Sequence, residues 1–186
     1  MPAKINIVFG FFFLVLTAAL GPVMVQNLPA VADAGANKQA AMGPLQLAAD
    51  SDFENQETLE PLRAYEIAQM NSKALLALNT QLNAQVPNTI IKGGPHAHGN
   101  LEALLNIAVG LVLLFLTVGR SFQWLISLTF VIGTLMHSGV MYLAIIFEQG
   151  WAGMLLQTGI GPVMILAGLF LAGVAAAMGL KQPSVA

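Results

Sequence analysis

The sequence contains no cysteine and few charged residues, and both scarcities exclude large classes of protein. Without thiols the chain cannot form disulfides, thiolate metal sites, iron–sulfur clusters or covalent c-type haem links of its own. Charged residues make up only 9% of the chain and hydrophobic residues 56%, with a mean hydropathy of +0.74, which excludes an ordinary soluble domain. The net charge of −2 and the scattered lysines and arginines exclude a nucleic-acid-binding surface.

What the chain has instead is a set of long apolar runs that predict membrane crossings. Four stretches, at residues 5–25, 101–118, 122–147 and 154–179, each approach the roughly 20 residues that a spanning helix needs. We therefore expect an all-α integral membrane protein, a four-helix bundle in contact with the lipid bilayer. Within the last stretch, Pro162 predicts a kink.

The first apolar stretch has two interpretations. Lys4 precedes it and the small residues at 30–34 follow it, as in a cleaved signal peptide. We expect it to be retained as an anchor helix.

The positions of the basic residues predict the topology. Lys4, Arg120 and Lys181 border the N-terminus, the short turn between the second and third spans, and the C-terminus, whereas the link at 148–151 has no basic residue. Because lysine and arginine favour short cytoplasmic segments, we expect both termini in the cytoplasm. The chain would then be a multi-pass protein of a bacterial cytoplasmic (inner) membrane, with residues 26–95 in the periplasm.

Composition divides the chain into three parts: a transmembrane helix at 1–25, a long extracytoplasmic loop at 26–95, and three transmembrane helices at 96–186. In the loop, residues 26–50 are rich in Ala, Gly, Pro and Asn with no strong period, which predicts an extended connector. An amphipathic helix is then expected over residues 51–85.

The expected amphipathic helix has a start signal and a face that needs a partner. Ser51, followed by Glu54 three residues later, fits a capping box. The segment holds five acidic and two basic residues. Membrane-surface helices are usually basic, so we expect its apolar stripe to pack on protein, within the bundle or on a partner subunit. Residues 86–95, with Pro87 and Gly93-Gly94-Pro95, then return the chain to the membrane as a loop.

The string Pro95-His96-Ala97-His98-Gly99-Asn100-Leu101-Glu102 holds two of the three histidines, at the start of an apolar helix. Imidazole is the commonest metal ligand, and ionisable groups at membrane depth are a functional-site hypothesis by default. A helix that starts at Pro95 puts His98, Glu102 and Asn106 at i, i+4 and i+8, in one polar stripe. Because such groups avoid lipid, the stripe should face the bundle interior.

The third histidine, His137, is predicted to lie close to this stripe. Counted from the turn between the second and third spans at about 1.5 Å per residue, Glu102 and His137 are level, and His98 is about one turn further out, level with Tyr142. We expect His98 and His137 to be the cofactor ligands. Glu102 and Asn106 are expected to hydrogen-bond or tune these ligands, with Tyr142 beside them.

Three interpretations of these residues remain open. A haem b could lie between His98 and His137 in an apolar slot. A compact copper or zinc centre could form from His96, His98 and His137, with Glu102 as a further ligand. Alternatively there is no cofactor, His96 and His98 lie in water, and His137 only hydrogen-bonds Glu102. Four glycines are candidates to line a haem slot: Gly99, Gly110, Gly133 and Gly139.

Three segments together resemble a known kind of membrane protein. They are the His-Ala-His-X-Asn-Leu entry to the second span, the string Leu135-Met136-His137-Ser138-Gly139, and residues 161–168, Gly-Pro-Val-Met-Ile-Leu-Ala-Gly. This pattern resembles small four-helix membrane proteins that are similar to subunit I of haem–copper oxidases and nitric oxide reductases. The resemblance covers the membrane half of the chain and implies His96, His98 and His137 as haem or copper ligands.

The chain also departs from that pattern. It continues Leu101-Glu102-Ala103-Leu104 where the small proteins usually have Leu-Leu-Gly-Trp. Three histidines cannot build a complete oxygen-reducing centre with two haems and copper, so we do not expect oxidase catalysis by this chain alone.

The expected function is that of a haem b- or metal-binding membrane subunit of a respiratory or oxidase-like electron-transfer complex, as part of a hetero-oligomer with other membrane subunits. One alternative is a non-redox accessory subunit that stabilises a larger membrane complex. Another is a proton or ion pathway along His98, Glu102 and Asn106.

Overall fold

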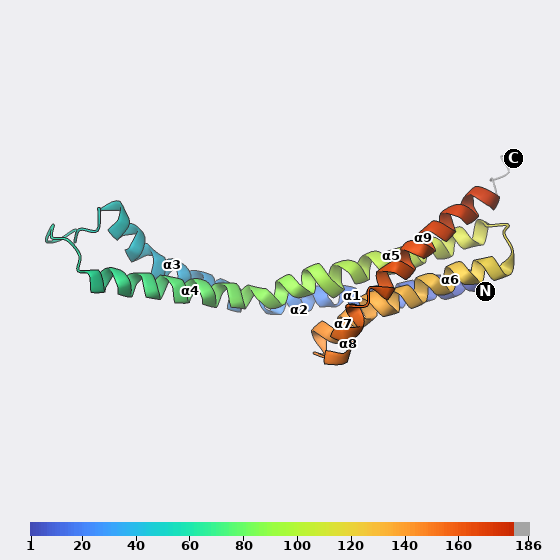
Figure 1. The fold of residues 1–186 in the computed structure, drawn as a ribbon, viewed down its shortest axis with the longest axis horizontal. Helices are drawn as coiled ribbons and strands as arrows, with labels where there is room; N and C mark the ends of the chain where they lie inside the picture. Colours follow the sequence, from blue (N-terminus) through green and yellow to red (C-terminus); the bar gives the residue numbers. More distant parts are fainter. Residues whose placement is uncertain (181–186) are drawn as a thin grey trace. The chain divides into compact units, whose positions relative to one another are not determined.

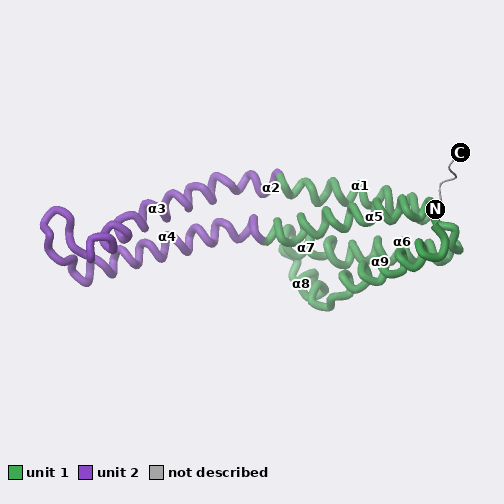
Figure 2. Tube along the Cα trace, turned by 90° about the horizontal axis from the view of Figure 1, so that it is seen from above, with its two compact units in different colours: residues 1–21, 90–186 green, residues 22–89 purple. Residues whose placement is uncertain are grey.

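The computed structural model describes residues 1–180, which form helices joined by turns, and Lys181 lies outside the described residues (Figure 1). Two compact units are present: residues 1–21 with 90–180, and residues 22–89 (Figure 2). In chain order the helices are α1 (Pro2–Ala18), α2 (Leu20–Gln26), α3 (Leu28–Asp50), α4 (Ala64–Ile91), the π-helical turn η1 (Lys92–His96), α5 (Ala97–Phe115), α6 (Arg120–Thr134), the π-helical turn η2 (Leu135–Gly139), α7 (Val140–Ile146), α8 (Gly150–Leu156) and α9 (Ile160–Gly179).

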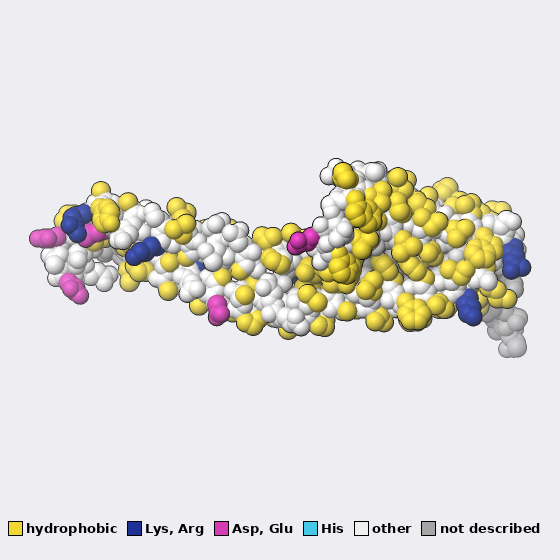
Figure 3. All heavy atoms as spheres, turned by 90° about the horizontal axis from the view of Figure 1, so that it is seen from below, with side chains coloured by type: hydrophobic (Ala, Val, Ile, Leu, Met, Phe, Trp, Pro, Cys, Tyr) yellow, Lys and Arg dark blue, Asp and Glu magenta, His cyan; other side chains and the backbone are white. Residues whose placement is uncertain are grey.

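Membrane-spanning capacity is the main property of this fold. Within the described residues, four helical runs are long and apolar enough to cross a bilayer: Pro2–Asp50, Ala64–Phe115, Arg120–Ile146 and Ile160–Gly179. Hydrophobic side chains cover most of the face of residues 1–21 and 90–180 seen in Figure 3, and large ones such as Phe12 and Phe170 are 75% and 70% exposed. Water penalises apolar patches of this kind, whereas lipid accommodates them. The predicted all-helical fold, with four helical runs able to span a membrane, is confirmed for the described residues.

Helix α1 packs in the bundle against α5. A Cβ on Gly10 would lie 2.7 Å from the Ala103 carbonyl oxygen, and one on Gly110 would lie 2.9 Å from the Ala3 carbonyl oxygen. Small residues allow backbones to approach this closely, which is a usual way for helices to associate in lipid. The first apolar stretch is therefore part of the bundle that holds the histidines.

Helices α6 and α9 complete the bundle, and their core is apolar. Ile126 and Phe130 of α6 are fully buried and belong to one core cluster with Ile165 of α9. The short turn between α5 and α6 is closed by Gln123, whose Nε2 donates to the carbonyl oxygens of Leu116 and Val118 at 3.3 and 3.1 Å. This satisfies carbonyl groups that the end of α5 leaves without helical partners.

Residues 26–50 correct one prediction, because they are helical rather than extended. Helix α3 covers Leu28–Asp50, with Pro29 at its start, where a missing N–H has no cost. This helix contains eight alanines, and alanine is the strongest helix former. Composition suggested a linker because of glycine and proline, but the summed propensity of the alanines favours the helix.

The start of the next helix also differs from the prediction. Ser51 does not begin a helix: its Oγ donates to the carbonyl oxygens of Ala48 and Glu54 in the turn that follows α3. Helix α4 begins at Ala64 instead, after a turn containing Asp52, Phe53 and Leu59 with positive φ angles. There Glu66 accepts a hydrogen bond from the Arg63 N–H at 2.9 Å and pairs with its guanidinium at 2.7 Å. These contacts cap the start of α4, a role that was predicted for Ser51 and Glu54.

The return to the membrane is helical too, although residues 86–95 were predicted as a loop. Helix α4 continues to Ile91 and passes through η1 into α5, with the one non-helical residue of this junction at Gly94 (φ −99°, ψ −112°). Gly94 precedes Pro95, and proline disfavours the α conformation in the residue before it. The predicted loop is thus reduced to a kink.

The last apolar stretch is broken at a different place from the predicted one. Residues 154–179 do not form one helix kinked at Pro162, because Gly159 adopts a left-handed conformation (φ 68°) between α8 and α9. Pro162 then lies in the first turn of α9, where proline needs no N–H partner. The glycine gives the chain its turn, and the proline fits without bending the helix.

Within residues 22–89, α3 and α4 form an antiparallel hairpin clamped at its base by two asparagines. Asn27 Nδ2 donates to the Ala84 carbonyl oxygen at 3.1 Å and to Asn88 Oδ1 at 3.4 Å, and Asn88 Nδ2 donates to the Met24 carbonyl oxygen at 3.1 Å. These contacts join α4 to α2 and to the residue that precedes α3, at the base of the hairpin.

We expect Asn88→Ala to loosen this hairpin by about 1 kcal/mol, the usual net value of a lost hydrogen bond between neutral groups. Hydrogen exchange of the α3 and α4 amides should accelerate. Thr89→Ala is the matched control, since the Thr89 hydroxyl bonds only to Gln85 of its own helix. Equal exchange rates in the two variants would show that the asparagines do not clamp the hairpin.

Candidate functional site

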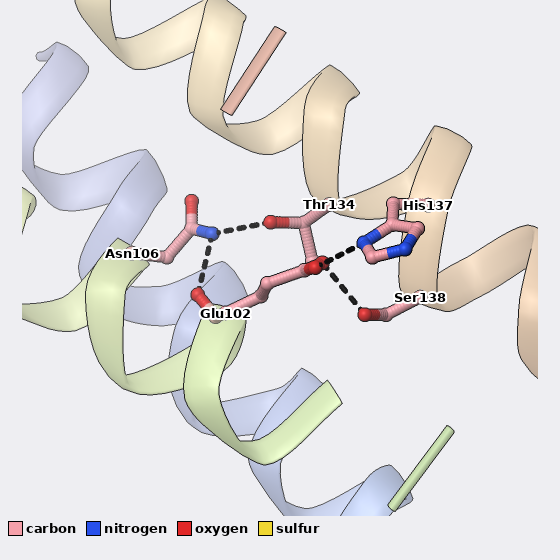
Figure 4. Close-up of polar contacts among 5 residues, drawn as sticks. All are labelled: Glu102, Asn106, Thr134, His137 and Ser138. Carbon is pink, nitrogen blue, oxygen red and sulfur yellow. Dashed lines mark hydrogen bonds and ion pairs between the residues drawn. The ribbon is translucent and has the colours of Figure 1, made fainter. Parts of the chain in front are cut away.

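The centre of the candidate site is the carboxylate of Glu102 on α5. Glu102 Oε1 lies 2.5 Å from His137 Nδ1, and Glu102 Oε2 accepts a hydrogen bond from Ser138 Oγ at 2.6 Å (Figure 4). The side chain of Glu102 is only 5% exposed and that of His137 only 14%. Both oxygens of a carboxylate inside an apolar bundle are therefore engaged by polar groups of the next helix, as burial of such a group requires.

The local backbone explains how two consecutive residues reach one carboxylate. His137 and Ser138 lie in η2, a π-helical turn inserted between α6 and α7. Such turns are rare and widen the helix locally, often at functional sites. A neighbouring helix holds this turn in place: a Cβ on Gly161 of α9 would lie 2.5 Å from the His137 backbone nitrogen.

His98 is the second imidazole at this site. Its ring lies edge to face with that of His137, with ring centroids 5.0 Å apart and an interplanar angle of 65°. His98 is exposed, whereas Glu102 is buried and His137 is half-buried. The two histidines predicted to approach each other from neighbouring helices do so, and one of them is accessible from outside the bundle.

The three side chains together form a possible metal-ligand set. One ligand atom from each of His98, Glu102 and His137 lies within 4.8 Å of the other two. Around an ion with bonds of about 2.0–2.2 Å, tetrahedral ligands are about 3.4 Å apart. The direct Glu102–His137 contact of 2.5 Å would therefore have to open if these two atoms were both ligands.

Glu102 can also act without touching an ion. When Glu102 is ionised it only accepts hydrogen bonds; His137 Nδ1 is then the donor in the pair, and Nε2 stays open for another partner. Metal-bound histidines commonly donate their second ring N–H to a carboxylate in this way, which fixes the tautomer and the direction of the ring.

A second tier of polar contacts lies one helical turn from this carboxylate. Asn106 Nδ2 donates to Thr134 Oγ1 at 2.8 Å and to the Glu102 carbonyl oxygen at 2.9 Å (Figure 4). Asn106 Oδ1 accepts from Asn6 Nδ2 of α1 at 3.0 Å. Asn6 Oδ1 in turn accepts a hydrogen bond from Ser127 Oγ of α6. Asn6, Asn106, Thr134 and Ser127 are all fully buried.

The predicted site residues are thus distributed over more than one place. Glu102 and Asn106 face the interior as the stripe predicted, and Asn106 acts through α1 and α6 without a bond to an imidazole. His96 lies apart from the other histidines, with Nδ1 3.0 Å from the Thr17 carbonyl oxygen and 3.5 Å from Asn100 Nδ2.

Tyr142 makes its aromatic contact with Phe147. Its ring lies 5.9 Å from that of Phe147, and it lines an apolar groove of about 540 Å³. Trp151 lines the same groove. The structure therefore brings together His98, Glu102 and His137, and it places Tyr142 on the wall of an apolar groove.

Three of the four glycines considered for a haem slot serve helix packing. A Cβ on Gly99 would strike Thr17, one on Gly110 would strike Ile7, and one on Gly133 would lie 2.9 Å from Ile165 Cγ1. Neighbouring helices fill this space, so these glycines do not line a slot. Only Gly139 borders an open groove, the one that Tyr142 lines.

Sequence reasoning missed Ser138, Thr134 and Asn6. A signal was present, because each is a polar residue in an apolar stretch and would be expected to face the bundle interior for the same reason as Glu102. Which partners they would meet does not follow from spacing. Asn6 and Asn106 are one hundred positions apart in the chain.

The chain matches no protein-family model, no curated protein and no solved structure. The resemblance to small oxidase-like membrane proteins therefore stays a prediction, and the geometry of Glu102 and its neighbours is what can support a function.

Proposed function

We propose that this chain is a metal-binding membrane subunit of an electron-transfer complex, with a compact ion held by His98 and His137 and oriented by Glu102. The observation that carries the proposal is the Glu102–His137 pair, at 2.5 Å, beside the exposed imidazole of His98. A carboxylate inside a membrane bundle is costly, so its presence beside two histidines favours a functional role over simple packing.

The ligand chemistry favours copper. Imidazole nitrogen suits copper, iron, nickel and zinc, and among divalent first-row ions copper(II) generally binds such sites most tightly. Zinc has no redox chemistry and could not carry an electron. A copper ion in this site would carry one electron by alternating between copper(I) and copper(II), in exchange with neighbouring redox subunits.

The spacing of the rings favours a compact ion over a haem. With metal–nitrogen bonds of about 2.05 Å and an imidazole radius of about 1.2 Å, the centroids of two rings on opposite sides of an iron are about 6.5 Å apart. The centroids of rings separated by angles of about 90–109° at the metal are about 4.6–5.3 Å apart by the same arithmetic. The separation of 5.0 Å between the ring centroids of His98 and His137 falls in the second range, which supports a compact ion as the ligand.

The proposal also includes the membrane topology of the chain and its assembly with other subunits. The basic residues Lys4 and Arg120 support cytoplasmic termini in a bacterial inner membrane, with His98 near the periplasmic side. A subunit with a single metal ion needs electron donors and acceptors, so the chain would work in a hetero-oligomer and not as an enzyme alone.

Equilibrium binding of copper(II) to the purified chain in detergent tests the proposal. We expect one ion per chain, with nitrogen hyperfine structure in the electron paramagnetic resonance spectrum. His98→Ala and His137→Ala should each weaken binding by at least tenfold. His96→Ala should bind as the wild type does, because His96 is engaged with Thr17 and lies outside the ligand set.

A non-redox accessory role is the second candidate, and one observation favours it. Among the described residues, every buried side-chain nitrogen or oxygen already has a hydrogen-bond partner within the chain. The polar network can therefore exist for packing alone. Wild-type protein that binds neither copper nor haem, with no Soret band after incubation with hemin, would favour this candidate over ours.

A further inference from the structure

We infer that Asn6, Asn106 and Thr134 form a register clamp across α1, α5 and α6 that aims the His137 imidazole at Glu102. The clamp rests on the proposed function and deepens it, because it sets the geometry of the proposed metal site. Asn6, Asn106 and Thr134 are positioning residues, none of which touches the ion.

Contacts between α5 and α6 repeat after one helical turn. Asn106 lies four residues after Glu102 on α5, and Thr134, the last residue of α6, lies four residues before Ser138 of η2. The Asn106–Thr134 contact, at 2.8 Å, is therefore the inner step of the same ladder whose outer step is the Glu102–Ser138 contact, at 2.6 Å. The Asn106–Thr134 contact therefore also fixes the axial position of Ser138 relative to Glu102.

Helix α1 orients the amide at the inner step. Asn6 donates to the one amide oxygen of Asn106, at 3.0 Å, and this leaves the Asn106 NH₂ group aimed at Thr134 and at the Glu102 carbonyl oxygen. Rotation of a side-chain amide by about 180° exchanges the positions of its oxygen and its NH₂ group. The hydrogen bond from Asn6 selects one of these two orientations for Asn106. Ser127 of α6 holds Asn6 itself through the Asn6 oxygen.

The apolar surroundings leave the residues of the clamp few alternative hydrogen-bond partners. Asn6, Asn106 and Thr134 are fully buried, where an unsatisfied amide is costly and alternative partners are scarce. Slippage of α6 along α5 by one residue would break the contacts of Asn106 with Thr134 and of Glu102 with Ser138 and His137 at once. The arrangement is thus either formed, with His137 Nδ1 on Glu102 Oε1, or lost.

Thr134 offers a matched pair of variants for testing the clamp. Thr134→Ser keeps the hydroxyl that Asn106 donates to, whereas Thr134→Val keeps the shape and removes the hydroxyl. The measurement is the ¹⁵N and ¹H spectrum of the histidine imidazoles in the metal-free protein in detergent. Spectra of His96→Gln and His98→Gln assign the signals. Because this measurement needs no metal, it tests the clamp even if copper binding fails.

We expect the wild type and Thr134→Ser to show a downfield Nδ1 proton on His137, as a strong hydrogen bond to a carboxylate produces. Thr134→Val should shift or lose this signal, while the helical content by circular dichroism stays unchanged. Asn6→Leu should do the same from a different helix. In the copper-loaded protein, Thr134→Val should weaken binding about tenfold, as outer-shell partners commonly do.

Two results would separate the hypotheses. A His137 signal that is the same in Thr134→Val, Thr134→Ser and wild type overturns the clamp, whatever the copper data show. A shifted His137 signal in a protein that binds no copper keeps the clamp and overturns the proposed function.

Discussion

Replacing Glu102 by leucine is expected to lower the free energy of unfolding by about 3 kcal/mol, because removing a buried carboxylate leaves the polar groups that bond to it without partners. The groups left behind are His137 Nδ1 and Ser138 Oγ, which both contact this carboxylate. Reversible unfolding in mixed detergent micelles, followed by circular dichroism, measures the loss.

Glu102→Gln is the matched variant that separates shape from charge. An amide oxygen can still accept from His137, and the Ser138 hydroxyl can reverse its role and accept from the amide NH₂ group. We therefore expect a stability loss of about 1 kcal/mol or less. Copper affinity should nevertheless fall about 10–100-fold, because the amide orients and polarises the imidazole less well than a carboxylate does.

The two variants together separate a metal site from a packing contact. If the Glu102→Gln protein is as stable as the wild type and binds copper as tightly, the charge of Glu102 has no role in binding. If the Glu102→Leu protein has the same free energy of unfolding as the wild type, the contact between Glu102 and His137 does not stabilise the bundle.

The depth of the site along the membrane helices was predictable from the sequence. A fixed rise of about 1.5 Å per residue puts Glu102 and His137 at one level, and the structure joins them. The interior direction of Glu102 and Asn106 was predictable for a similarly simple reason: a polar stripe on an apolar helix has one low-energy direction.

Rotation about the helix axis was not predictable in the same way. The π-helical turn at Leu135–Gly139 changes the phase of the helix, so a count with about 3.6 residues per turn does not give the direction of Ser138. The partner of Asn6 depends on which helices become neighbours, which no local pattern encodes. Sequence reasoning therefore found a pair, Glu102 and His137, and missed the network that holds it.

The segments outside the bundle were predicted less well, because local signals there compete. In α3, glycine and proline suggested a connector while alanine favoured a helix, and the helix formed. Ser51 and Glu54 fitted a capping box, but such pairs mark a helix only where the following residues can adopt one. Here Asp52 and Phe53 take positive φ angles and α4 starts later.

Gly161→Ala is expected to have the second large effect, through the backbone that carries His137. A Cβ at this position would lie 2.5 Å from the His137 nitrogen, 2.6 Å from its Cβ and 2.7 Å from the Met136 carbonyl carbon. These are backbone atoms or atoms fixed to the backbone, so no side-chain rotation relieves the clash. Helix α9 or the π-helical turn must shift, at a cost of about 1–3 kcal/mol.

Gly173→Ala on the same helix is the control, since a Cβ at Gly173 would have no other atom within 4 Å. Alanine favours helix over glycine by up to about 1 kcal/mol, so this variant should be neutral or slightly more stable. Copper affinity should fall more than tenfold in Gly161→Ala and stay unchanged in Gly173→Ala. Equal affinities would mean that the π-helical turn can move without disturbing His137. The contact between α9 and this turn would then have no part in setting the direction of the imidazole.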